Sequence, residues 1–402
     1  MKTSGKTLVA STLCLLLWHA PLASGCFSYH FITDAVTPAK DGVIAGGLVR
    51  PSRGDGHYWL YKVEPNGRRV MDIPDNGAQW RTVRAVSGTA DGGFVAADDS
   101  CRYTDPKYPC SSFVRRFSKD GILLWERDVS GSRRNEAVAV FELEDGGFAY
   151  AGAGARYDNA MGVVHTTMEF SRLDGSGKVI LQKAFDGRIY DMRPVPGGFL
   201  VAAQDREEGF GRVFTDSRDA TVELRGADFE RVWVKRLDRE PGNPDRDYTV
   251  AARPAADGGV LAVVQTVGWF KPVKKGWLVR LDSRREIVWD RLIYEKDESA
   301  LTDAAMLDDG GAIVSGVLRP DGALQGAAFV ARVGADGKVA WRTVLGVAEN
   351  CWGAKVVSSG VGYMAAFNVS PGSSGSETYT VWVGVDAGGR ELWRRRLPEE
   401  IR

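Results

Sequence analysis

The stretch DGGFVAADDS at residues 91–100 belongs to a pattern that recurs seven times along this 402-residue sequence. In each copy a glycine-rich turn is followed by a short run of small and apolar residues. The copies are KDGVIAGG (40–47), DGGFVAA (91–97), DGGFAYAG (145–152), PGGFLVAA (196–203), DGGVLAVV (257–264), DGGAIVSG (309–316) and SGVGYMAA (359–366). A period of roughly fifty residues that is sustained along most of a chain indicates a repeat architecture rather than independent domains.

A second landmark follows each glycine turn by roughly thirty residues and has the pattern strand, tight turn, strand. Its clearest copies are FVRRFSKDGILLWERD (113–128), WLVRLDSRREIVWDRL (277–292), FVARVGADGKVAWRTV (329–344) and VWVGVDAGGRELWRRR (381–396). Asp-Gly and Gly-Gly pairs supply the positive φ of two-residue hairpin turns, so such turns are expected here. The second strand carries a large apolar residue in every repeat: Trp125, Trp233, Trp289, Trp341 and Trp393, with Met71 and Leu181 in the other two.

Each repeat therefore contains four short antiparallel strands, which is the content of one propeller blade. The sequence predicts an all-β fold, a seven-bladed β-propeller of four-stranded antiparallel blades that fills residues 26–402. Small residues after the glycine turn suit inner strands near the axis, and the Trp strand suits the outer packing between blades. Two or three β-sandwich domains would also have recurrent strands, but they give no reason for seven equivalent Gly-Gly and Trp landmarks. Every blade is complete in sequence, so we expect no strand to be shared and the ring to close by packing of blade seven against blade one.

Two segments carry a resemblance to known propeller repeats. VGADGKVAW (333–341) and VDAGGRELW (385–393) resemble the Asp-x-x-Gly-x-x-x-Trp stretch of PQQ-like repeats. The DGGF turn followed by the later strand pair is similar to the delta-60 type of bacterial propeller repeat. The resemblance covers nearly all of residues 26–402 and implies a propeller fold, and its motifs are structural rather than catalytic.

Residues 1–25 have the layout of a secretory signal peptide. Lys2 and Lys6 precede an apolar run, and small residues lie before Cys26. The segment Ala23-Ser24-Gly25-Cys26 also resembles a bacterial lipobox, although Ala23 stands where Leu is usual. The resemblance implies lipidation of Cys26 and a location in the periplasm or at the outer membrane; ordinary cleavage at the same bond is the alternative.

The remaining cysteines fit an exported, disulfide-permissive protein. We predict a disulfide between Cys101 and Cys110, which are close in sequence, and metal binding by the pair is the weaker interpretation because no His lies nearby. Cys351 either stays buried as a thiol or pairs with Cys26 if that residue carries no lipid.

Binding groups are expected on the face where the connections between blades, and between the second and third strands, vary in length. Aromatic and Arg side chains are the usual anchors of a protein or glycan contact. The alternative is that they cap the blades and shield the core. The candidates are Arg102, Tyr103, Tyr108, Tyr157, Phe210, Arg212, Trp269 and Phe270.

Charged side chains offer few candidates for catalysis. Lys plus Arg balance Asp plus Glu at 52 each, which argues against a nucleic-acid partner. His30, His57 and His165 lack metal-ligand spacing, so neither a metal nor a cofactor is predicted. A carboxylate pair for a glycosidase would have to come from Asp98, Asp99, Glu207, Glu208, Asp216 and Asp219. Four further residues precede the first strand of their repeats and either collect a cation at the channel mouth or bond the neighbouring blade's backbone: Asp191, Asp247, Asp303 and Asn350.

The sequence thus favours a non-enzymatic, monomeric propeller of the cell envelope that binds a protein or glycan partner or acts as a scaffold. A propeller hydrolase or lyase that acts on glycans through loop carboxylates is the alternative. Two carboxylates about 5–10 Å apart across the channel mouth would favour that alternative.

Overall fold

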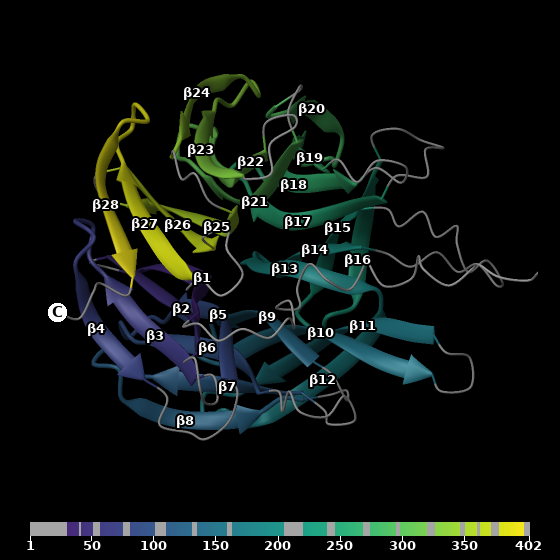
Figure 1. Cartoon of the computed structure of the whole chain (residues 1–402). Helices are drawn as coiled ribbons and strands as arrows, with labels where there is room; N and C mark the ends of the chain where they lie inside the picture. The colour runs from purple at the N-terminus through teal and green to yellow at the C-terminus, as the bar shows by residue number, and fades with distance from the viewer. Residues whose placement is uncertain are drawn as a thin grey trace, which may run out of the picture.

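The computed structural model forms seven four-stranded antiparallel sheets around a common axis, and this confirms the predicted seven-bladed propeller (Figure 1). Among the described residues, no helix has the length and apolar character needed to cross a bilayer. The structure describes residues 30–39, 42–50, 57–74, 81–100, 110–130, 135–158, 163–204, 220–238, 246–267, 274–294, 298–319, 326–345, 350–359, 362–370 and 378–397.

Each blade is built from four consecutive strands that run from the axis outward. The first strands are β1 (His30–Ala39), β5 (Arg81–Gly88), β9 (Asn135–Glu142), β13 (Arg188–Val195), β17 (Arg246–Pro254), β21 (Glu298–Met306) and β25 (Asn350–Ser359). The second strands are β2 (Gly42–Arg50), β6 (Phe94–Ser100), β10 (Phe148–Asp158), β14 (Gly198–Gln204), β18 (Val260–Val267), β22 (Ala312–Arg319) and β26 (Gly362–Ser370).

The two outer layers complete the blades. The third strands are β3 (His57–Val63), β7 (Ser111–Phe117), β11 (Val163–Leu173), β15 (Ala220–Gly226), β19 (Lys274–Leu281), β23 (Ala327–Val333) and β27 (Tyr379–Val385). The fourth are β4 (Arg69–Pro74), β8 (Leu123–Asp128), β12 (Val179–Asp186), β16 (Arg231–Leu237), β20 (Ile287–Leu292), β24 (Val339–Val344) and β28 (Glu391–Leu397). No sheet mixes strands from the two ends of the described chain, so the expectation of complete blades is confirmed.

The second glycine of each glycine turn is required by a close backbone approach. A Cβ at Gly93 would lie 2.4 Å from the carbonyl oxygen of Phe117, the last residue of β7. The same conflict with a third-strand carbonyl occurs in all seven blades, at Gly42, Gly93, Gly147, Gly198, Gly259, Gly311 and Gly362. Only glycine lets the first hairpin of the blade lie this close to the third strand, which explains why the sequence repeats it.

The aspartate of the DGG motif has two partners. Asp91 accepts the backbone N–H of Gly93 at 3.0 Å and a hydrogen bond from Arg116 of the third strand at 2.5 Å. These bonds lower the pKa of Asp91 to about 2. The same pairing of turn aspartate and third-strand arginine recurs as Asp145–Arg172, Asp257–Arg280 and Asp309–Arg332. The motif therefore ties the first hairpin of a blade to its third strand.

The tight turns are one residue longer than predicted. Glu64 N–H bonds to the carbonyl of Arg68, and the N–H of Gly67 bonds back to Glu64, so three residues lie between the paired positions. Gly67 has φ of 85° and the β3–β4 register shifts beside it. This is a three-residue turn with a glycine bulge, and the prediction of two-residue turns was wrong because both types place a glycine at positive φ.

The outer Trp of one blade packs on the turn of the next blade. The Trp393 ring lies against Gly67, where a Cβ would come within 2.7 Å of it, and the indole N–H donates to the carbonyl of Pro65 at 2.9 Å. Trp289 and Trp341 donate in the same way to Ala335 and Ala387. The predicted role of this residue in packing between blades is confirmed.

Blade three lacks this Trp, and the neighbouring turn compensates for the loss. Leu181 occupies the position, and the facing turn of blade four holds Phe229 at φ of 66° in place of a glycine. The Phe229 ring is fully buried and stacks on Phe170 and Phe199 with centroids 5.2 Å apart in both pairs. The aromatic ring thus comes from the turn instead of from the outer strand.

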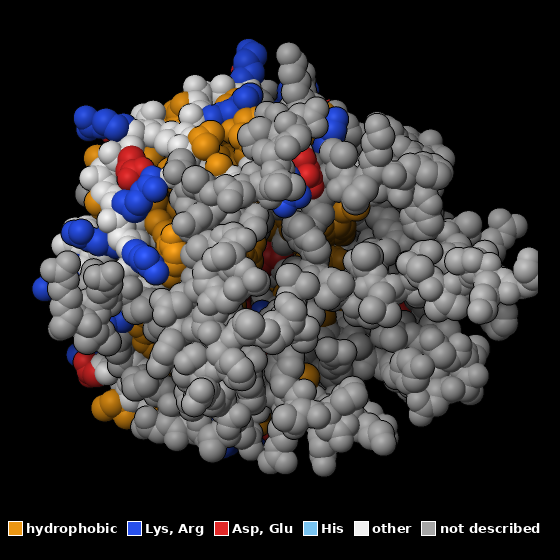
Figure 2. Space-filling view, in the orientation of Figure 1, with side chains coloured by type: hydrophobic (Ala, Val, Ile, Leu, Met, Phe, Trp, Pro, Cys, Tyr) orange, Lys and Arg blue, Asp and Glu red, His pale blue; other side chains and the backbone are white. Residues whose placement is uncertain are grey.

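The outermost strands combine exposed aliphatic side chains with charged ones. Leu123 and Leu124 of β8, Val232 of β16 and Val288 of β20 are exposed. Lys and Arg side chains stand among hydrophobic ones on the rim of the ring (Figure 2). Charged side chains on an edge strand oppose pairing with a second molecule.

The ring closes through a buried polar cluster between blades seven and one. Asn368 of β26 accepts the N–H of Thr33 at 2.9 Å and donates to the Thr33 carbonyl at 3.0 Å. Trp382 donates to the hydroxyl of Tyr61 at 3.1 Å across the same junction. Closure of the described ring thus uses side-chain hydrogen bonds and packing, as expected.

We predict that Asn368→Ala lowers the free energy of unfolding by about 2–4 kcal/mol, because it leaves the buried N–H and carbonyl of Thr33 without a partner. Urea unfolding monitored by Trp fluorescence measures the change. Asn66→Ala, in an exposed turn, is the matched control and should cost less than half as much. Equal losses for the two variants would contradict the role given to Asn368.

Candidate functional site

The inner strands share a β-bulge at corresponding positions, and these bulges turn side chains toward the axis. The residues passed over in the pairing are Asp34, Arg84, Val138, Tyr190, Val250, Thr302 and the pair Gly353-Ala354. The single bulge residues remain half-buried in strands whose neighbours are mostly buried. The axis is therefore lined partly by polar and charged groups, and we take this lining as the candidate site.

On blades one and two, an arginine lies between two carboxylates. Arg84 contacts Asp34 of blade one at 3.0 Å and Asp99 of its own blade at 3.3 Å. Asp99 is 4% exposed and also accepts the N–H of Ala137, in blade three, at 2.7 Å. The cluster joins three consecutive blades.

Asp99 is an unusual acid. Burial raises its pKa to about 7, although the charge of Arg84 and the hydrogen bond from Ala137 act in the opposite direction. A carboxyl with this pKa is suited to proton transfer near neutral pH. Because its side chain is almost fully covered, Asp99 cannot reach a substrate and its role is structural.

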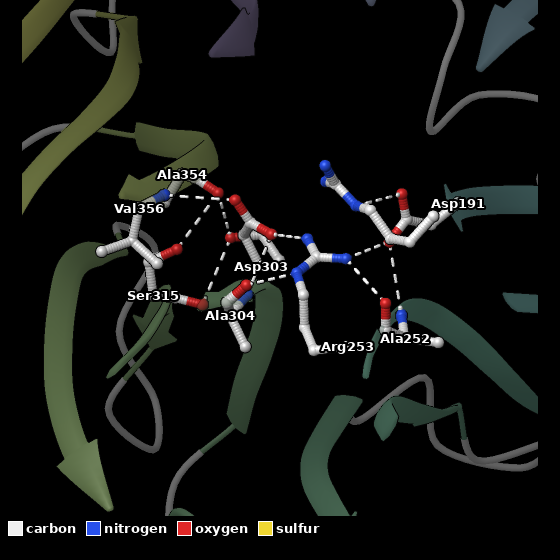
Figure 3. A network of polar contacts seen from close by, with 10 residues as sticks. Asp191, Ala252, Arg253, Asp303, Ala304, Ser315, Ala354 and Val356 are labelled. Atoms are coloured by element: carbon white, nitrogen blue, oxygen red, sulfur yellow. Dashed lines mark hydrogen bonds and ion pairs between the residues drawn. The ribbon is translucent and has the colours of Figure 1, made fainter. Parts of the chain in front are cut away.

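On blades four to six, a second arginine lies between two carboxylates. Figure 3 shows Arg253 between Asp191 and Asp303, and it donates to both carboxylates and to the carbonyl of Ala304. The two carboxylates in turn accept backbone N–H groups of the following blades, from Ala252 and Val356. Asp191 and Asp303 therefore bond the neighbouring blade's backbone, and that interpretation of the sequence is confirmed.

The neighbouring positive charges hold Asp191 ionised. Burial alone would raise the pKa of Asp191, but Arg193, Arg253 and Lys355 together hold it below its usual value. Asp191 therefore stays an anion and is no candidate for a general acid.

Two tyrosines line the axis between blades four and five. Tyr190 and Tyr248 stack with centroids 5.6 Å apart, and the Arg188 guanidinium lies 5.3 Å from the Tyr190 ring. Each hydroxyl meets a glutamine of the second strand, Gln204 or Gln265. These glutamines also donate to backbone carbonyls of the next blade, so the aromatic pair is fixed by the blade junctions.

A glycosidase would need two of the described carboxylates to face the same sugar. Asp191 and Asp303 approach each other, but Arg253 lies between them and bonds to both. A glycosidase needs one protonated and one ionised carboxyl facing the same sugar. Arg253 occupies the space between these two carboxylates, so they do not face a common substrate position. Among the described residues, no three His, Cys, Asp or Glu side chains are grouped as metal ligands.

Most residues predicted from sequence to bind a partner lie outside the described residues. These are Arg102, Tyr103, Tyr108, Phe210, Arg212, Trp269 and Phe270, together with Cys26, Cys101, Glu207, Glu208, Asp216 and Asp219. The backbone of Tyr157 pairs with Val164 in β10 and β11. Cys110 and Cys351 are buried, and the pairings proposed for them stay predictions.

A polar residue that recurs at one repeat position could have predicted the axial contacts. Asp99, Gln204, Gln265 and Asn368 occupy the same place in their repeats, six residues after the second glycine. All four bond to the inner strand of the following blade. A polar residue recurring in a strand of small apolar residues indicates such a contact. The arginines that pair with the axial aspartates have no equivalent repeat position.

No protein-family model and no curated protein matches the sequence. Among solved structures, the chain is similar to polysaccharide lyase Uly1 (13% identity, TM-score 0.58, 91% of this chain and 93% of that one). It is also similar to a PL25 ulvan lyase (10%, 0.53, 90% and 93%) and to the β-propeller domain of the Trilobed protease from Pyrococcus furiosus (12%, 0.51, 91% and 96%). Identities this low show a shared propeller fold alone.

The raised pKa of Asp99 predicts that part of the free energy of unfolding is lost as the pH rises. Its pKa in the folded protein is about 7, above the usual 3.8, so the folded state binds this proton more tightly than the unfolded state. The stabilisation is complete below pH about 4 and is lost as the pH rises through about 7. We expect the urea midpoint of the wild type to fall relative to that of Asp99→Asn over this range.

Asp91→Asn is the matched control for this measurement. The pKa of Asp91 is lowered to about 2, so its stabilisation is present above pH 4 and is lost only as the pH falls toward 2. The Asp91→Asn protein should keep the wild-type slope between pH 5 and 7. A wild-type slope in Asp99→Asn as well would show that Asp99 ionises normally.

Proposed function

We propose that this chain is a non-enzymatic binding or scaffold propeller of the bacterial cell envelope. Its signal peptide directs export, a lipid on Cys26 holds it at the membrane, and the face with the long connections binds a protein partner. The protein is a monomer in this proposal, because a single chain supplies all seven blades.

The observation that carries the proposal is the engagement of the axial carboxylates. Asp34 and Asp99 share Arg84, and Asp191 and Asp303 share Arg253. Ion pairs of this kind serve the junctions between blades. In this proposal the ion pairs occupy Asp34, Asp191 and Asp303, and Asp99 is almost fully covered, so none of the four acts on a substrate.

The difference between the two faces supports the position of the partner site. On one face the fully described hairpins close through short turns. In blade four, Pro194 pairs with Phe199 and Val195 pairs with Gly198. On the other face the spacing varies widely, from Asp158 to Val163 in one blade and from Gln204 to Ala220 in another. A rigid ring that carries connections of unequal length is a common arrangement for binding.

Two polysaccharide lyases are among the similar structures, so the alternative function, a glycan-active propeller, is tested as well. Their likeness is limited to the fold, so the alternative needs evidence from activity. Release of unsaturated or reducing-end products from envelope or uronate-rich polysaccharides by the purified protein would contradict a non-enzymatic role.

We predict that a photo-crosslinking residue at Tyr103, Tyr157 or Phe270 captures one envelope protein in intact cells. Asp120 and Asp336, in exposed short turns of the other face, are the matched control positions. The expected result is the same partner, identified by mass spectrometry, from all three test positions and from neither control. Equal capture from both faces, or no capture from the test positions, would overturn the proposed binding face.

The lipid anchor has a separate test. The intact mass of the mature protein should equal that of residues 26–402 plus acyl chains, and Cys26→Ala should release the protein from the membrane fraction. A mass without acyl chains would remove the anchor and leave pairing of Cys26 with Cys351 as the alternative. The same measurement counts the disulfides.

A further inference from the structure

The cluster around Arg253 contains more positive than negative charge. Three cationic side chains, Arg193, Arg253 and Lys355, act on two carboxylates, Asp191 and Asp303. If all five groups are ionised, one positive charge remains without a counterion inside a half-buried region. Such a surplus is unfavourable unless water or a bound anion compensates it.

The surplus is located on Arg193. Arg253 uses its guanidinium fully, with bonds to Asp191, to Asp303 and to backbone carbonyls. The ion pair of Arg193 with Asp191 is recorded at Nε, 3.3 Å away, and this buried Nε makes no hydrogen bond with the described residues. The two terminal nitrogens of Arg193 donate no hydrogen bond to the described residues, and the side chain is 39% exposed.

The environment of Arg193 is that of a cation in excess. Burial and the neighbouring charge of Arg253 lower its pKa, and Asp191 and Asp303 offset this only in part. An anion near the terminal nitrogens would relieve the repulsion between the two guanidinium groups.

The cluster lies on the axis and near the face with the short turns. Arg193 pairs with Leu200 and Arg253 with Leu261, both close to the hairpin ends of their blades. Lys355 belongs to blade seven, and its charge still reaches Asp191 of blade four. These side chains therefore converge from several blades on one place at the axis.

We propose that Arg193 forms a binding site for a carboxylate on the propeller axis, with Arg253 as the fixed base of the site. The site lies at the end of the axis opposite the proposed partner face, and it does not depend on that proposal.

The chemistry favours a carboxylate over a dianion. The surplus is one charge, which a single carboxylate neutralises, whereas a phosphate dianion would leave negative charge beside Asp191 and Asp303. The two terminal nitrogens of Arg193 match the two oxygens of a carboxylate in a bidentate pair. A uronic acid or the free end of a peptide would supply the same group.

The test is isothermal titration of the full mature protein with glucuronate and with N-acetylalanine, each against a neutral twin, glucose or N-acetylalanine amide. We expect the carboxylates to bind and the twins not to bind. A preference for glucuronate would identify a sugar acid as the source, and a preference for N-acetylalanine a peptide end. Binding of inorganic phosphate without either carboxylate would overturn the assignment.

Three variants separate the site from the stability of the ring. Arg193→Gln should weaken carboxylate binding by about 10- to 100-fold, the range expected for a lost charge-assisted bond. Arg193→Lys should restore part of the affinity because it keeps the charge without the fork. Arg127→Gln, on the exposed outer strand β8, should bind as the wild type does. Unchanged affinity in Arg193→Gln, or no carboxylate binding by the wild type, would refute the site.

Discussion

Adjacent blades in this propeller share no strand, and at several junctions the main chain of an inner strand finds its partner on the preceding blade. The solution is a buried polar side chain that bonds directly to the backbone of the next blade. Asp99 binds Ala137, Asp303 binds Val356, and Asn368 binds both backbone groups of Thr33. Buried backbone groups without such partners would be costly, and the ring would lose its register.

The charged lining of the axis follows from these contacts. A half-buried carboxylate that accepts a neighbouring blade's N–H is unfavourable without a counterion. An adjacent arginine supplies the opposite charge. Arg84 and Arg253 do this on different sides of the ring, each between two carboxylates. Structural need therefore accounts for four axial acids. It does not account for Arg193, which contacts an aspartate that Arg253 already neutralises.

Much of the fold could be predicted from the sequence because its landmarks have local physical causes. The second glycine repeats because a third-strand carbonyl excludes a Cβ, and the Trp repeats because it covers the next blade's turn. The turn length was mistaken, since a glycine at positive φ is common to two turn types. The pairs Arg84–Asp34 and Arg253–Asp191 could not be predicted, because each joins different repeats and neither has equivalents elsewhere. The residues selected for partner binding remain predictions.

The absence of a shared strand has a consequence for how such a chain can change. Each described sheet is contiguous in sequence, and its contacts with the next blade include side-chain bonds to inner-strand backbone and packing on turns. The seam between blades seven and one is chemically of the same kind as the other six. A duplication or circular rearrangement of the gene at any connection between blades would keep every sheet whole.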